Sequence, residues 1–180
     1  MLFRTKHIPS SRQGTVLNFL LLSSLLSLLF FTSPLPADEP FAPWVQLTAE
    51  GNAALGQQKI PTKAEVGIPA YPNAYIVSIA SMEDKKSGKT IPVLHLVSQD
   101  SVEAIVTFYK TELLKIQGWQ WDEIFEAFYL GDSYEGALSQ LNPYMEITQI
   151  SPDSERLKYV APSYKGTIKS WIQIVCPLKK

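Results

Sequence analysis

The chain has 180 residues, 46% of them hydrophobic and 18% charged, which is long and apolar enough to fold around its own core. Three of its 16 basic residues and none of its 17 acidic residues precede Asp38, so residues 38–180 carry 13 basic against 17 acidic groups, a formal charge of −4. Arg156 is the only arginine in that part. Because nucleic-acid binding normally requires a basic face rich in Arg and Lys, we expect no nucleic-acid partner.

Residues 1–37 have the pattern of a secretory signal peptide. A basic n-region that ends at Arg12 precedes an uncharged apolar run, residues 16–31, and a small, helix-breaking segment that ends at Ala37. This pattern predicts a protein exported to the periplasm or outside a bacterial cell, with Asp38 as its first residue. The alternative is an uncleaved membrane anchor, although the apolar run is shorter than the ~20 residues of a spanning helix.

Two residue types that often carry chemistry occur once each after residue 37. Cys176 is the only cysteine, which excludes an internal disulfide framework. We interpret it as a small buried hydrophobe, with an intermolecular disulfide as the alternative. His95 is the only histidine after residue 37, so a His-based metal cluster is impossible. We therefore expect neither a metal nor a cofactor.

The first elements are an arm and a β-hairpin. Residues 38–66 are predicted to form an N-terminal arm with a short helix within 41–58 and a linker. A single α+β domain is predicted over 67–180, entered through a proline-rich loop over 60–73. Strands are expected over 74–82 and 90–98. The second is apolar on both faces, which is typical of a central strand.

The best-marked element is a central helix over about 100–117. Asp100 has the position of an N-cap, Glu103 completes a capping box, and Gly118 suits a left-handed C′ residue. A stripe with a helical period predicts which face is buried. The stripe comprises Val102, Ile105, Val106, Tyr109, Leu113 and Ile116. We interpret Phe108 as a flank of the core and Leu114 as an exposed leucine.

The remainder alternates short strands and turns. Strands are predicted over 119–122 and 125–130, although residues 123–130 would also suit a helix. A short helix is expected over 132–140, followed by strands over 144–150, 156–161 and 167–176, with a loop over 162–166. The fold class is therefore α+β, in the order β-β-α-β-β-(α)-β-β-β. An antiparallel sheet carries the central helix on one face.

Three short segments of the sequence together form a recognisable signature. They read Ile68-Pro-Ala-Tyr-Pro-Asn-Ala74, Asp100-Ser-x-Glu-x-Ile-x-x-Phe-Tyr-Lys110 and Gly118-Trp119. This resembles a group of small exported bacterial α+β domains of unknown function, over about residues 67–121. Their signature is Tyr-Pro-(Gly/Asn)-Ala, then Asp-Ser-x-Glu-x-(Val/Ile)-x-x-Phe-Tyr-Lys, then Gly-Trp. Asn73 stands where glycine is usual. The resemblance implies a fold and no catalytic residues.

Enzyme signatures are absent from the sequence, which has no Gly-x-Ser-x-Gly elbow, phosphate loop or His-Glu-x-x-His motif. A Ser–His–acid hydrolase would have to use His95, which lies mid-strand in an apolar run, so we assign it to the core or a sheet face. The prediction is a non-catalytic binding domain, whose partner is an envelope protein or a small apolar ligand. The alternatives are a membrane-anchored envelope component, touching the membrane only through its N-terminal segment, and, less favoured, a hydrolase with an unrecognised site.

Aromatic side chains supply the candidate binding residues. Tyr71 and Pro72 lie in the loop before the first strand, and Trp119 and Trp121 lie in the strand after the central helix. Trp and Tyr combine a large apolar body with a polar tip and often anchor binding surfaces. We predict that these four residues bind a ligand or partner, and we assign no catalytic and no metal-binding residue.

Overall fold

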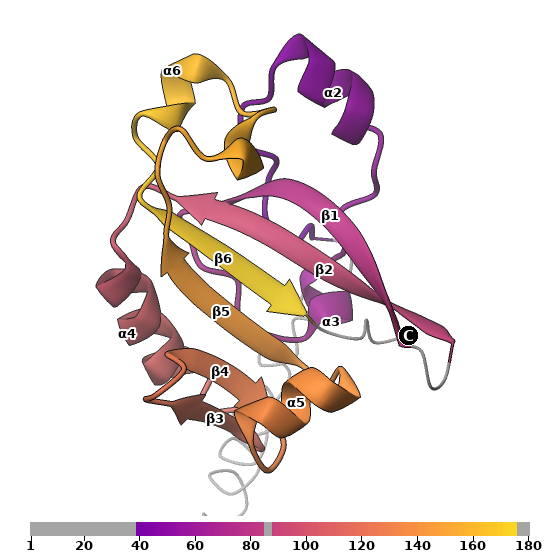
Figure 1. Cartoon of the computed structure of the whole chain (residues 1–180), viewed down its shortest axis with the longest axis vertical. Coiled ribbons are helices and arrows are strands. Elements are labelled where there is room, and N and C mark those ends of the chain that lie inside the picture. Colours follow the sequence, from indigo (N-terminus) through magenta and orange to yellow (C-terminus); the bar gives the residue numbers. More distant parts are fainter. Residues whose placement is uncertain (1–38, 85–87, 176–180) are drawn as a thin grey trace, which may run out of the picture. The chain divides into compact units, whose positions relative to one another are not determined.

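A computed structural model describes residues 39–84 and 88–175 (Figure 1). The predicted signal segment, residues 1–37, and Cys176 lie outside the described residues. In chain order the elements are α2 (Ala49–Leu55), α3 (Lys63–Val66), β1 (Ala74–Asp84), β2 (Lys89–Ser98), α4 (Val102–Glu112), β3 (Trp119–Asp122), β4 (Ala127–Leu130), α5 (Tyr134–Gln140), β5 (Tyr144–Gln149), the 3-10 turn η1 (Glu155–Leu157), α6 (Pro162–Lys165) and β6 (Ser170–Val175).

Within the described ranges, one antiparallel sheet of six strands organises the fold, in the order β1-β2-β6-β5-β4-β3. The last strand, β6, lies between β2 and β5 and pairs antiparallel with both. It therefore joins the β1–β2 hairpin to the β3–β4–β5 meander. Strand β2 is internal, as its apolar residues on both faces predict. The α+β class is confirmed.

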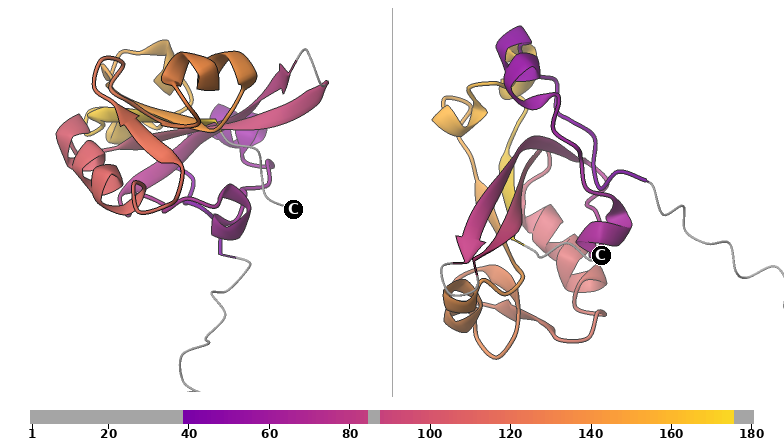
Figure 2. Two further views of the ribbon diagram at one scale, coloured as in Figure 1. Left: turned by 90° about the horizontal axis from the view of Figure 1, so that it is seen from below. Right: turned by 90° about the vertical axis from the view of Figure 1, so that its right-hand side faces the viewer.

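Helices α3 and α4 cover one face of the sheet, and α5 and η1 cover the other (Figure 2). The first face holds the largest apolar cluster, in which α4 contributes its buried residues Ile105 and Tyr109. The cluster also contains residues from all six strands, including Ile76, Leu94, Leu96, Trp119, Phe128, Met145, Ile147, Ile172 and Ile174. These residues belong to the alternating pattern of each strand, so the helical stripe and the strand period meet in one core.

The second face carries two separate apolar clusters. One contains Val45 of the N-terminal arm, Leu157 of η1 and Trp171 of β6. The other gathers residues of α5, including Tyr134, against β4, β5 and the end of β6. Trp171 and Val175 of β6 lie in different clusters, with Gln173 between them. This face is therefore apolar at both ends and polar in the middle.

The central helix is shorter than predicted. Ser101, not Asp100, is the N-cap: its side chain accepts a hydrogen bond from the backbone N–H of Ala104 at 3.4 Å. The helix ends at Glu112, and turns follow up to Gly118, whose φ of +93° is left-handed as expected. Ile116 is therefore outside the helix and 37% exposed, which corrects its place in the buried stripe.

The N-terminal arm is mostly extended rather than helical. Phe41 and Val45 are buried, and the backbone N–H of Val45 donates to the carbonyl of Ile76 at 2.8 Å, so the arm runs along the edge strand β1. The short helix predicted within 41–58 is confirmed as Ala49–Leu55. The predicted loop over 60–73 contains α3, which begins with a capping box formed by Thr62 and Glu65.

The other corrections concern the second half of the chain. Residues 156–161 are not a strand: η1 occupies Glu155–Leu157, and Val160 makes only an isolated bridge with Leu47. Six strands are therefore described rather than seven. The predicted loop over 162–166 contains α6, which has proline in its first turn. Residues 123–130 form a turn and strand β4, so the strand prediction is right and the helix alternative is wrong.

Candidate functional site

Tyr71 lies at the junction between its loop and α4. It is buried, its ring meets Phe108 edge-on at 5.2 Å between centroids, and its hydroxyl donates to Asp100 Oδ2 at 2.8 Å. Burial, helped by the hydrogen bond to Asp100, raises the pKa of Tyr71 to about 12. Pro72 is exposed and lines a shallow hollow together with Tyr71. Tyr71 therefore fastens the loop to the start of α4.

The two tryptophans of β3 have different surroundings. Trp119 is buried in the main core. Trp121 is half-buried, its ring lies 4.5 Å from that of Phe128, and Lys110 Nζ is 4.4 Å from the ring centroid. Among the aromatic contacts of the described residues, none joins Tyr71 to either tryptophan. Tyr71 and Trp119 belong to the same core cluster, but neither tryptophan lines the hollow of Tyr71 and Pro72.

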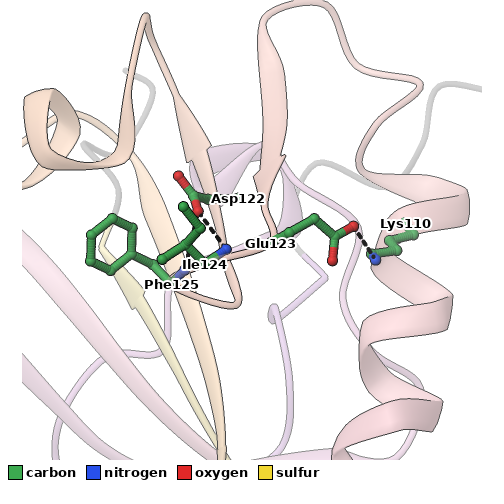
Figure 3. A network of polar contacts seen from close by, with 5 residues as sticks. All are labelled: Lys110, Asp122, Glu123, Ile124 and Phe125. Carbon is green, nitrogen blue, oxygen red and sulfur yellow. Dashed lines mark hydrogen bonds and ion pairs between the residues drawn. The ribbon is translucent and has the colours of Figure 1, made fainter.

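The turn after Trp121 displays apolar side chains on a hydrogen-bonded backbone. We define the hairpin tip as residues 122–126, which comprise the last residue of β3 and the turn that leads to β4. Asp122 Oδ1 accepts from the backbone N–H of Ile124 at 2.9 Å and of Phe125 at 3.1 Å. Glu123 forms an ion pair of 3.2 Å with Lys110 of α4 (Figure 3). These contacts hold the turn while Ile124 is 87% exposed and Phe125 46% exposed.

The hairpin tip is also acidic. Its sequence is Asp-Glu-Ile-Phe-Glu, with Glu126 in the left-handed region at φ 49°. Three carboxylates therefore surround two apolar side chains, and only Glu123 has an ion pair among the described residues. Phe125 rests 5.0 Å from the ring of Tyr134 on α5, while Ile124 projects into solvent.

A second candidate site lies on the sheet face that is polar in the middle, next to the edge strand β1. No sequence motif indicates it. It is a groove of about 300 Å³, which we call the sheet-face groove. Its floor comes from β1, β2 and β6, and its wall from η1, the residues after it and the end of α2. The lining residues are Leu55, Val77, Ser78, His95, Glu155, Arg156, Lys158, Tyr159, Trp171 and Gln173.

A row of polar side chains crosses the sheet at the level of this groove. Ser78, His95, Gln173 and Glu146 are successive cross-strand partners on β1, β2, β6 and β5. All four are half-buried. Glu146 accepts a hydrogen bond from the hydroxyl of Tyr134 on α5. The groove end of the row thus remains accessible, while the Glu146 end is covered by α5.

His95 is held in a defined orientation. Its Nδ1 lies 2.9 Å from Ser78 Oγ, and its ring lies 5.0 Å from that of Trp171 with 31° between the planes. Burial lowers the pKa of His95, and the nearby Arg156 charge lowers it further, against an opposing effect of the Gln173 hydrogen bond. The balance favours the neutral form of the His95 ring.

The Ser78–His95 pair invites comparison with a hydrolytic dyad. In such a site a carboxylate orients the far side of the imidazole and stabilises its protonated form. Here the neighbour of His95 on β6 is the neutral Gln173, and the nearby charge is the cation Arg156, which opposes protonation of the ring. The arrangement therefore suits recognition by hydrogen bonding better than general-base catalysis.

Within the described residues, no group of three or more His, Cys, Asp or Glu side chains is placed to hold a metal ion. Over the same ranges, no helix has the length and apolar character required to cross a membrane. No protein family model, curated protein or solved structure matches the chain.

Proposed function

We propose that the protein is a non-catalytic binding domain of the bacterial envelope, and that it binds a partner protein through the hairpin tip. The observation that carries the proposal is the 87% exposed Ile124 on a turn whose backbone is held by Asp122. Ile124 and Phe125 are adjacent exposed apolar side chains that offer contact area to a partner, and a hydrogen-bonded turn loses little entropy on binding.

The chemistry of the hairpin tip restricts the partner. Ile124 and Phe125 require an apolar pocket, and the carboxylates around them favour a rim of Lys or Arg on the partner. Burial of both apolar side chains contributes at most ~3–6 kcal/mol before the cost of association. A stable complex therefore requires a wider interface, for which the adjacent half-buried Trp121 and the edge strand β3 are available.

The experiment is a comparative capture from the native envelope with residues 38–180 as bait. The Ile124→Ser, Phe125→Ser double variant removes the apolar tip, and Leu114→Ser is the matched control because Leu114 is an exposed leucine, at 38%, outside the hairpin. We expect one basic-rimmed partner that is captured by the wild type and the control and lost with the double variant. Capture of the same protein at wild-type yield by the double variant would contradict the proposal.

The proposed location follows from residues 1–37, as a cleaved signal peptide with an uncleaved anchor as the alternative. Amino-terminal sequencing of the protein isolated from the envelope distinguishes the two. A start at Asp38 supports cleavage, and a start at Met1 supports the anchored form.

A further inference from the structure

The wall of the sheet-face groove carries two cations that lie over aromatic rings. The guanidinium carbon of Arg156 is 5.3 Å from the ring centroid of Trp171, and Lys158 Nζ is 4.5 Å from that of Tyr159. Cation–π contacts of this kind restrain long side chains without neutralising their charge. Among the described residues, neither cation has a carboxylate within 4.0 Å. The rim also bears the carboxylate of Glu155. Two cations against one carboxylate leave the rim with a net positive charge.

The floor of the groove supplies flat and polar groups at the same place. The His95 ring lies against Trp171, and Ser78 Oγ and the Gln173 amide flank it. A sheet face that served only the core would be apolar here, as it is in the clusters on either side. Ser78, His95 and Gln173 are half-buried and line the groove instead. Ser78 Oγ contacts His95 and Gln173 Nε2 donates to the Tyr144 hydroxyl, so these side chains form an ordered polar floor.

We propose that the sheet-face groove binds a small planar carboxylate, such as an aromatic acid. The planar guanidinium of Arg156 matches a carboxylate with two parallel hydrogen bonds, and Lys158 adds a second positive charge. The ring of the ligand packs against the apolar lining provided by Leu55 and Val77. A volume of about 300 Å³ lies at the small end of ligand sites and fits one ring rather than an extended molecule.

This site is independent of the partner surface proposed above. The groove belongs to β1, β2 and β6, whereas the hairpin tip joins β3 and β4 at the other side of the sheet. Loss of one site by substitution therefore leaves the other available, and the two proposals can fail separately.

The test is a titration of ¹⁵N-labelled residues 38–180 with benzoate, followed by amide chemical shifts. Benzamide is the neutral analogue and cyclohexanecarboxylate is the non-planar one. We expect saturable shifts around the groove with benzoate, and affinity at least about tenfold weaker with benzamide. Cyclohexanecarboxylate, which keeps the charge, should bind more weakly than benzoate but more tightly than benzamide.

Substitutions of Arg156 test whether this residue binds the carboxylate of benzoate. Arg156→Gln should weaken benzoate at least about tenfold, and Arg156→Lys should restore part of the loss because it keeps the charge without the planar fork. Lys169→Gln is the matched control, since Lys169 is an exposed cation outside the groove, and it should leave the affinity unchanged. Absence of saturation with benzoate in the millimolar range, equal binding of benzamide, or wild-type affinity in Arg156→Gln would each overturn the proposal.

Discussion

Replacing Asp100 with alanine tests whether the Tyr71 loop is held to the start of α4 for structural reasons. Asp100 Oδ2 accepts from Tyr71 at 2.8 Å and from Asn73 Nδ2 at 2.9 Å. Hydrogen bonds to ionised groups contribute about 1.5–3 kcal/mol when shielded from water. Tyr71 is buried but Asn73 is exposed, so we assign the Tyr71 bond about 1.5 kcal/mol and the Asn73 bond about 0.5 kcal/mol. Asp100→Ala should therefore cost about 2 kcal/mol.

Urea unfolding followed by tryptophan fluorescence measures this loss. Tyr71→Phe should cost about 1–1.5 kcal/mol, and the double variant should be little worse than Asp100→Ala alone, because both remove the same bond. Asp153→Ala is the control, since that carboxylate is exposed in a turn and makes no side-chain hydrogen bond among the described residues. Additive effects of the two substitutions, or a loss below ~0.5 kcal/mol for Asp100→Ala, would refute the reasoning.

The pH dependence gives a second check on the same contact. Hydrogen bonds from Asn73 and then Tyr71 lower the pKa of Asp100 below its ordinary value. The folded state therefore favours the carboxylate, and the contribution is complete above the unfolded pKa of about 3.9. It is lost as the pH falls through the folded pKa. The difference in stability between wild type and Asp100→Ala should accordingly shrink below about pH 4.

Two further stability predictions follow from single residues. Because burial lowers the pKa of His95, protonation of its ring favours the unfolded chain. The wild type should therefore lose stability as the pH falls below about 6.5, whereas His95→Gln should not. Thermal unfolding between pH 7 and 5 measures this difference. Gly118→Ala should cost about 1–2 kcal/mol in urea unfolding, since φ is +93° and the new Cβ would lie 2.9 Å from Leu130 Cδ1. Gly166→Ala, with nothing within 4 Å, should cost nothing; equal losses at the two glycines would contradict this account.

The sequence predicts best where one local signal determines the structure. The period of two in β1 and β2 and the period of 3.6 in α4 identify three elements that face the same core. It fails where two local signals compete. Asp100 and Ser101 both suit an N-cap, and Ser101 caps the helix because Asp100 is engaged by Tyr71 and Asn73, 29 and 27 residues earlier in the chain.

The error over residues 156–161 has a similar origin. Alternating Leu157 and Tyr159 resemble a strand, yet Leu157 and Val160 are the buried pair, at the spacing of a tight helical turn. Their burial against Val45 and Trp171 depends on the N-terminal arm, which arrives from more than 100 residues away in sequence. Tertiary packing therefore decides a segment whose own pattern is too short to do so.

The candidate sites show the same division between local and long-range information. The exposed hairpin tip follows from a short apolar pair, Ile124-Phe125, between acidic residues, and that signal is visible once the segment is known to be a turn. The sheet-face groove has no such signal. His95 meets Ser78 only through the register of β1 and β2, and meets Gln173 only because β6 inserts beside β2. From sequence alone, a single histidine in an apolar strand is interpreted as a core residue. The strand order shows its actual neighbours, which are a hydroxyl, an amide and, through Trp171, an arginine.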